Sequence, residues 1–168
     1  LVTDDGVHHY VDCLVAATGF HSHDFLPGVE VTGLGNANLH KEWENKGGPE
    51  AYLGITVSGF PNLFFLYGPN TNLGHSSIIF MIECQVHYIL KVIGLLNMKG
   101  GKTIEITHNS MEEFNQAIQK NLKRTAWAGS CNSWYKSARG KIINNWSTHT
   151  VGYWLRTRRP IADHYLVK

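Results

Sequence analysis

The sequence feature that most constrains the fold is a corner rich in glycine and proline at residues 59–77, GFPNLFFLYGPNTNLGHSS. Residues 63–67 form a continuous apolar run of strand length, and a helical pattern begins at Ser76 or Ser77. We therefore predict a buried strand, a tight glycine turn, and a helix whose N-terminus lies over the carboxyl end of that strand. Open α/β folds bind cofactors at such junctions, although many corners of this type are purely architectural.

The N-terminal residues indicate a second strand. Residues 1–3 and 7–16 have the form of two arms joined by a turn that contains Gly6. The second arm ends in VDCLVAATGF, in which residues 11–17 are nearly all apolar. A run of this kind suits a strand that is covered on both faces, so we predict a central, parallel strand and the α/β fold class.

After the corner, apolar residues recur every three or four positions, which predicts a long helix that ends at Gly100. The apolar face is wide, so we expect it to pack against the sheet. Its members are Ile78, Ile82, Val86, Ile89, Ile93 and Leu96.

Residues 103–107 alternate in polarity as an edge strand does. A second helix is predicted to begin at Asn109 or Ser110, because Ser110 and Glu113 have the spacing of a capping box, and to run to about residue 125. Its inner stripe should consist of Met111, Phe114, Ile118 and Leu122. From residue 126 the sequence is an aromatic loop, which either covers a site or wraps around the body of the protein.

The composition is that of a packed protein without a polyanionic partner. The 168 residues are 43% hydrophobic and carry a net charge of +2, so we expect no nucleic-acid binding. The basic residues gather late in the chain, which we interpret as a solvated face. The most apolar segment, residues 78–96, is interrupted by polar and charged residues, and we therefore predict no membrane span.

Cysteine and histidine usage indicates a reduced protein without a metal. Cys13, Cys84 and Cys131 are far apart in the sequence, so we expect free thiols and a cytoplasmic location. His21 and His23 have the spacing of alternate strand residues, but no third ligand is close, and we predict no metal site. The chain does not begin with methionine, and we expect it to be the C-terminal portion of a longer protein.

Three segments, taken in order, give a family resemblance that none gives alone. VDCLVAATGF resembles the strand and ATG turn of flavoproteins with two dinucleotide-binding domains, where the chain returns from the NADPH domain to the FAD domain. AYLGITVSGFPNLFFLYGPNTNLGHSS resembles the closing FAD-site segment of flavin-dependent monooxygenases, most closely the Baeyer-Villiger type. TAWAGSCNSWYKSARGKIINNW, with DHY after it, is similar to the C-terminal segment of one subgroup of these enzymes.

The resemblance implies a Rossmann-like, FAD/NAD(P)-binding α/β fold, with residues 1–168 as one unit in the C-terminal part of the FAD domain. Residues 1–20 would form a crossover hairpin and strand, and residues 21–58 a loop excursion. Residues 59–97 would form the flavin-facing strand, turn and helix. Residues 98–168 would supply a last strand, a helix and a C-terminal lid.

The resemblance also implies cofactor contacts. Near the domain crossover would lie Thr18 and Gly19, and near the isoalloxazine Gly68, Pro69 and Asn70. The turn before a helix whose N-terminus faces the flavin pyrimidine edge would consist of Thr71, Asn72, Leu73 and Gly74. Trp127 or Trp134 would correspond to a loop tryptophan that contacts NADP.

The implied function is that of an FAD- and NADPH-dependent monooxygenase, which inserts one oxygen atom of O2 into a ketone or transfers it to an amine or a sulfide. The chain lacks both GxGxxG motifs and the FxGxxxHxxxW fingerprint of the family. The family arginine that acts beside the flavin belongs to the missing portion, so we assign no catalytic residue here. We expect the isolated chain to be inactive.

Two alternatives remain open at the level of sequence. The first is another flavoprotein with two domains, either an N-hydroxylase or a pyridine-nucleotide reductase, although no redox cysteine pair of a reductase is visible. The second is a binding module that keeps the fold without the chemistry. The substrate and the oligomeric state do not follow from the sequence.

Overall fold

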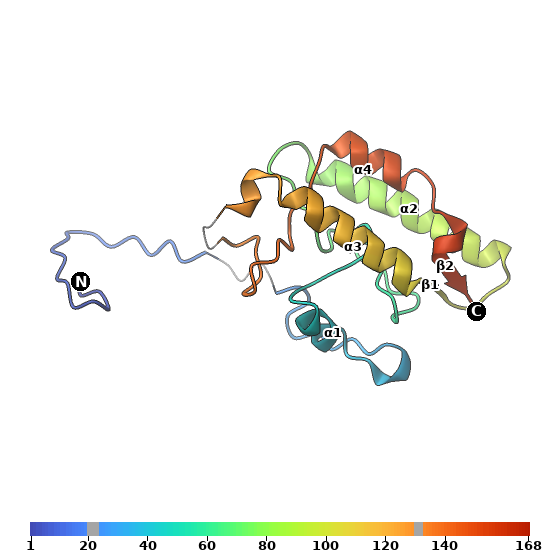
Figure 1. Cartoon of the computed structure of the whole chain (residues 1–168), viewed down its shortest axis with the longest axis horizontal. Coiled ribbons are helices and arrows are strands. Elements are labelled where there is room, and N and C mark those ends of the chain that lie inside the picture. The colour runs from blue at the N-terminus through green and yellow to red at the C-terminus, as the bar shows by residue number, and fades with distance from the viewer. Residues whose placement is uncertain (20–23, 130–132) are drawn as a thin grey trace.

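The structure is a computed structural model that describes residues 1–19, 24–129 and 133–168. In this part of the chain, four α-helices and a two-stranded sheet surround an irregular central segment (Figure 1). The helices are α1 (Leu39–Asn45), α2 (Ile78–Met98), α3 (His108–Leu122) and α4 (Thr150–Thr157), and the strands are β1 (Ile104–Ile106) and β2 (Tyr165–Val167). Three short 3-10 turns complete the set: Leu34–Asn36, Ala126–Ala128 and Ala162–His164.

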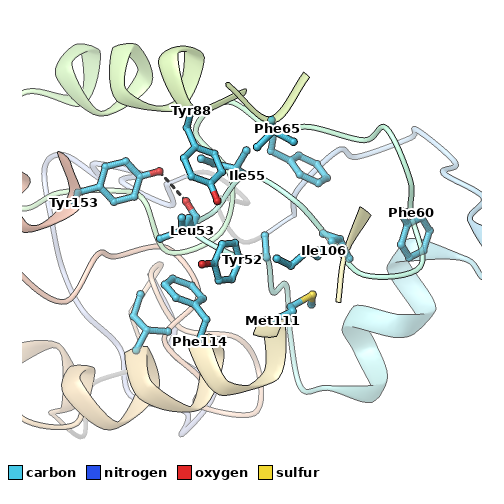
Figure 2. Packing of buried hydrophobic residues seen from close by; sticks show 14 of the residues in the cluster. Tyr52, Leu53, Ile55, Phe60, Phe65, Tyr88, Ile106, Met111, Phe114 and Tyr153 are labelled. Carbon is cyan, nitrogen blue, oxygen red and sulfur yellow. Dashed lines mark hydrogen bonds between the residues drawn. The ribbon is translucent and has the colours of Figure 1, made fainter. Parts of the chain in front are cut away.

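The core is built around residues 51–65, which run between α2 and α3 (Figure 2). Tyr52, Leu53 and Ile55 are almost fully buried there, Tyr88 covers them from α2, and Phe114 covers them from α3. Removing this much aromatic and aliphatic surface from water is the main stabilising contribution to the body of the protein.

Helix α2 confirms the predicted long helix, and its start is fixed by Ser77. The Ser77 hydroxyl accepts a hydrogen bond from the N–H of Phe80 at 3.2 Å, as an N-cap residue does. Helix α4 packs along α2, and both run in the same direction, because His75 stacks on His149 at one end while Lys91 donates to the carbonyl of Arg158 at the other (Figure 1).

The predicted inner stripe of α2 is wrong. The buried positions are Met81, Cys84, Gln85, Tyr88, Val92 and Leu95. Val86 and Ile93 of the predicted stripe remain 39% and 37% exposed. A helix that is apolar on several sides offers more than one stripe with the same spacing, so periodicity alone cannot choose which one is buried. Of the described helices, α2 is also the one with the length and apolar composition of a membrane span, a property that core helices share.

Neither the predicted buried strand at residues 63–67 nor the predicted parallel strand near the N-terminus forms within the described residues. The run 63–67 has no strand pairing, and it is bounded by left-handed backbone at Asn62 (φ 60°) and Tyr67 (φ 57°). Its hydrogen bonds to the body are instead those from the N–H of Phe65 to the carbonyl of Ile55 at 2.8 Å and from the N–H of Tyr67 to Oε1 of Gln85 at 2.8 Å. A parallel strand needs neighbouring strands to bond its backbone, and the sheet of the described residues contains only β1 and β2.

The N-terminal arm, residues 1–19, extends away from the body (Figure 1). Its predicted hairpin is present, with an antiparallel bridge between Val2 and His8 around a turn at Gly6. The apolar second part is exposed, however, with Leu14 at 65% and Val15 at 81%. The expected burial on both faces is therefore wrong for this chain by itself.

The C-terminal elements follow the prediction more closely. Strand β1 pairs with β2 in antiparallel register, Ile104 opposite Val167, which confirms a strand at residues 103–107. Helix α3 buries the predicted stripe of Met111, Phe114, Ile118 and Leu122. Its cap is Thr107, whose hydroxyl accepts from the N–H of Ser110 at 3.3 Å, so the predicted capping box at Ser110 and Glu113 is wrong.

Candidate functional site

The corner after residue 67 is held by Asn70. Its backbone N–H donates to the carbonyl of Ile143 at 2.7 Å, and its Nδ2 donates to the carbonyls of Ile142 (2.9 Å) and Asn145 (3.1 Å). Asn70 has a positive φ of 58°, which asparagine tolerates better than most residues, and it is 2% exposed. Asn70 thus ties the corner to residues 142–145, which lie more than 70 positions later in the sequence.

Asn72 continues the same connection. Its N–H donates to the carbonyl of Asn144 at 2.8 Å, and its own carbonyl accepts from the N–H of Trp146 at 2.7 Å. Nδ2 of Asn72 also donates to Oδ1 of Asn145 at 2.8 Å. Residues 70–72 and 142–146 therefore lie side by side as two bonded backbones, which we call the corner clamp.

Two glycines of the corner allow close packing. A Cβ on Gly68 would lie 2.3 Å from the carbonyl oxygen of Gly54, which is too short for any side chain. A Cβ on Gly74 would lie 2.6 Å from the ring of Trp127. Thr71 completes the turn by donating its hydroxyl to the carbonyl of Gly68 at 2.7 Å. Pro69 is buried within the same turn. Residues 68–71 are therefore interior, whereas Gly74 is exposed beside the indole of Trp127.

The N-terminus of α2 lies at the exposed end of this corner. Among the described residues, the backbone N–H groups of Ile78 and Ile79 have no hydrogen-bond acceptor, as is usual in a first helical turn. Helix α4 begins beside it, where the hydroxyls of Ser76 and Thr150 lie 3.5 Å apart. Two helix N-termini thus meet at one place, which favours negative charge there.

A chain of buried hydrogen bonds connects the corner to helices α2 and α4. The N–H of Tyr67 donates to Oε1 of Gln85 at 2.8 Å, and Nε2 of Gln85 donates to the hydroxyl of Tyr153 at 3.0 Å. The Tyr153 hydroxyl in turn donates to the carbonyl of Leu53 at 2.7 Å (Figure 2). Burial raises the pKa of Tyr153 above its ordinary value, so this hydroxyl stays protonated and keeps its role as donor.

The two candidate tryptophans lie in the same loop but in different environments. Trp127 is half-buried, with its ring against Gly74 and edge-on to Tyr135 at 5.3 Å between centroids. Trp134 is 53% exposed and also lies edge-on to Tyr135, at 5.9 Å between centroids. Trp127 therefore packs against the corner, while the ring of Trp134 is largely exposed to solvent.

The structure does not bring Thr18 and Gly19 to the corner. Both are exposed on the N-terminal arm. His21, His23 and Cys131 lie outside the described residues. Within the described ranges, no group of histidine, cysteine and carboxylate side chains has the geometry of a metal site.

Sequence reasoning missed the most important partners of the corner. The segment Asn144, Asn145 and Trp146 carries no individual prediction, yet Asn145 is only 1% exposed. Gln85 was counted as an interruption of an apolar helix, yet it is fully buried and bonds the corner. A polar residue inside a long apolar helix is the signal that indicates a buried bond of this kind.

Known monooxygenases match this chain along nearly its whole length. The chain is 43% identical to the FAD-binding monooxygenase ktnD of Aspergillus niger, over 90% of its own residues and 25% of the relative. It is 37% identical to a Baeyer-Villiger monooxygenase of Pseudomonas aeruginosa, over 98% of its own residues and 31% of the relative. No family model matches the chain.

Solved structures give the same result. The closed crystal structure of a cyclohexanone monooxygenase matches with a TM-score of 0.76 and 29% identity, over 99% of this chain and 32% of that one. The NADP+-bound cyclohexanone monooxygenase of Rhodococcus sp. Phi1 matches with a TM-score of 0.71 and 26% identity, over 99% and 32%. The chain belongs to the flavin-dependent monooxygenases of the Baeyer-Villiger type. It spans about a third or less of the length of these relatives.

The corner fits the cofactor that such a relationship implies. Gly74 is exposed and has the ring of Trp127 on the side where a Cβ would stand, and the unbonded N–H groups of Ile78 and Ile79 follow it four and five positions later in the chain. Nδ2 of Asn145 is a buried donor without a partner in the adjoining clamp. These are donors and flat surfaces, with no carboxylate among them, which suits a planar ligand that carries negative charge.

Proposed function

We propose that the chain forms one wall of the flavin site in a monooxygenase that uses FAD, NADPH and O2. The oxygen atom is inserted into a small-molecule ketone in a Baeyer-Villiger reaction, or transferred to an amine or a sulfide. The observation that carries this proposal is the agreement of the chain, along nearly its whole length, with enzymes of this type. The chain corresponds to the C-terminal part of the FAD domain of a flavoprotein with two dinucleotide-binding domains.

Residues 68–74 hold the flavin end of the cofactor. Gly68, Pro69, Asn70 and Thr71 are buried and shape the backbone from within, and the side chains of Asn70 and Thr71 are hydrogen-bonded to protein carbonyls. Asn72, Leu73 and Gly74 form the surface that the ring system contacts. Thr18 and Gly19 approach this site only when the N-terminal arm is packed against the rest of the enzyme.

Bound FAD supplies the redox chemistry and the reaction with O2, and the residues of this chain bind, orient and exclude water. The N–H groups of Ile78 and Ile79 stabilise negative charge at the pyrimidine edge of the flavin, an effect worth roughly 0.3 to 1 kcal/mol for a helix N-terminus and more when partly buried. Trp127 or Trp134 contacts NADP from the C-terminal loop, which acts as a lid.

The test is an assay of the complete reading frame that contains these residues, supplied with FAD, NADPH and cyclohexanone. We expect NADPH consumption coupled to lactone formation, detected by mass spectrometry with isotopically labelled O2. The 168-residue chain alone should oxidise no NADPH beyond a protein-free blank. Absence of a lactone, amine-oxide or sulfoxide product from a panel of substrates would contradict the proposal.

A backbone substitution tests the role of the α2 N-terminus directly. Proline is well tolerated at the first position of a helix, and Ser77 before it already has the extended backbone that a following proline requires, with ψ at 121°. Ile78→Pro therefore removes one N–H donor without breaking a helical hydrogen bond. We expect FAD to bind the complete enzyme roughly fivefold to tenfold more weakly, since a charge-assisted hydrogen bond is lost.

Ile78→Ala is the matched control, because it shortens the same side chain and keeps the N–H. FAD fluorescence quenching measures both variants independently of turnover. Equal weakening in the two variants would place the effect on the side chain and exclude the backbone donor as a flavin contact.

A further inference from the structure

A cationic hollow lies between the C-terminal half of α3 and the turn at residues 136–142. Its volume is about 400 Å³. The residues that line it are Gln119, Lys123, Ala128, Lys136, Arg139, Gly140, Lys141 and Ile142. Half of them carry a positive charge, and among these described lining residues none is acidic. None of them belongs to the predicted flavin contacts.

The floor of the hollow is fixed by hydrogen bonds. The N–H of Ser137 donates to the carbonyl of Lys141 at 2.8 Å, and Lys136 and Ile142 form an antiparallel bridge, so the turn is a small hairpin. Nε2 of Gln119 donates to the carbonyl of Ile142 at 2.8 Å, which ties this hairpin to α3. The backbone segments that carry the cations, the end of α3 and the hairpin, are therefore tied together at one hollow.

The four cations differ in what they already bind. Lys141 is paired with Glu50, with 2.5 Å between Nζ and Oε1, and burial lowers its pKa. Lys136 donates to the carbonyl of Gly129. Lys123 and Arg139 are exposed, and neither forms an ion pair with any described residue.

The position of Lys123 has a structural explanation that Arg139 lacks. A lysine in the last turn of a helix interacts favourably with the helix dipole, which accounts for Lys120 and Lys123 on α3. The helix dipole does not account for Arg139, which comes from a separate hairpin and adds a like charge to the lining of the same hollow. Like charges held close together are unfavourable unless an anion lies between them.

We propose that this hollow binds a multiply charged phosphate group, either free diphosphate or a phosphate of a nucleotide. Arginine presents a planar fork that matches two phosphate oxygens, and lysine adds a point charge from another direction. A ligand with two or more negative charges interacts with Lys123 and Arg139 together, whereas a single carboxylate neutralises only one of them. The described residues of the lining include no aromatic ring on which a base of single-stranded nucleic acid would stack, so a small ligand fits better than a polynucleotide.

The first test is calorimetric titration of the 168-residue chain with sodium pyrophosphate at low ionic strength. We expect saturable 1:1 binding with a Kd of about 1 mM or below, weakened by added salt because the attraction is electrostatic. Arg139→Gln and Lys123→Gln should each weaken binding at least fivefold, as expected when one charge-assisted contact is lost.

Lys120→Gln is the matched control, because it removes a positive charge from an exposed position near the same end of α3, and Lys120 does not line the hollow. We expect less than a twofold change for this variant. Weakening by Lys120→Gln that equals that of Arg139→Gln would overturn the proposal in favour of diffuse charge attraction, and so would the absence of saturable binding. Thermal melts of all variants should coincide, since each substituted side chain is exposed.

Competition distinguishes the two sources of the phosphate. NADP+ and NAD+ differ by one phosphate ester, so stronger displacement of pyrophosphate by NADP+ assigns the hollow to a nucleotide phosphate. Displacement that is equal for the two, and weaker than by unlabelled pyrophosphate, assigns it to a free diphosphate. Both outcomes are independent of flavin binding and of monooxygenase activity, so they separate this proposal from the one above.

Discussion

The corner and the N-terminal arm have similar kinds of sequence but differ in burial and in backbone hydrogen bonding. Both have an apolar run of strand length followed by glycine, at residues 63–67 and 11–17. In the corner, Phe65 and residues 68–71 are buried, because residues 142–146 and Gln85 satisfy the backbone and polar groups there, although Leu66 and Tyr67 remain 51% and 43% exposed. The arm is exposed, with Val15 at 81%, and its backbone bonds are few. An apolar run is thus ordered by the partners that satisfy its backbone, and hydrophobicity alone does not supply them.

The largest expected effect comes from breaking the clamp at Asn70. Asn70→Ala removes the two side-chain donors to the carbonyls of Ile142 and Asn145 and places alanine at a φ of 58°. We expect the free energy of unfolding to fall by about 3 kcal/mol, since two buried acceptors lose their partner and the backbone is strained. Urea denaturation of the 168-residue chain, followed by tryptophan fluorescence, measures this.

Asn36→Ala is the control for the backbone conformation. Asn36 has a similar φ of 60°, but it is exposed and its side chain makes no hydrogen bond to any residue that the structure describes. The control should cost no more than about 1 kcal/mol, which is the strain contribution alone. Equal losses at both positions would show that the clamp contributes nothing beyond backbone conformation.

How much of this the sequence could predict depends on where each bond partner lies. Ser77 and the inner stripe of α3 were predictable, because a cap and a helical stripe involve residues only a few positions apart. The partners of Asn70 lie more than 70 positions away, and nothing local in residues 142–146 indicates them. The buried stripe of α2 was not predictable for a related reason, since Ile82 and Met81 satisfy the same period and only packing distinguishes them.

An intermediate effect is expected at high pH, where the buried tyrosines of the body titrate. Burial raises the pKa of Tyr165 to about 12, from an ordinary value of 10.0. Because the folded pKa is the higher one, this stabilisation is fully present below pH 10 and is lost as the pH rises toward 12. We expect thermal stability of the chain to fall steeply in that window, by an amount on the order of 1 to 3 kcal/mol from this residue.

Tyr165→Phe removes the group that titrates, so the fall in stability above pH 10 should become shallower. It also removes the hydroxyl that donates to Tyr88 at 3.1 Å, which lowers stability at neutral pH. Tyr10→Phe is the control, because Tyr10 is 97% exposed and should leave the pH profile unchanged. An unaltered profile in Tyr165→Phe would locate the alkaline transition elsewhere in the molecule.

The smallest expected effect is at the arm. Val15→Ser should change the free energy of unfolding of the isolated chain by less than about 0.5 kcal/mol, because the side chain is exposed and packs against nothing in the described body. In the complete enzyme the same substitution should cost about 1 to 3 kcal/mol, since a covered strand loses apolar contact there. Differential scanning calorimetry of both proteins measures the difference. A cost above 1 kcal/mol in the isolated chain would mean that the arm already packs without the rest of the enzyme, and the contrast between arm and corner would then disappear.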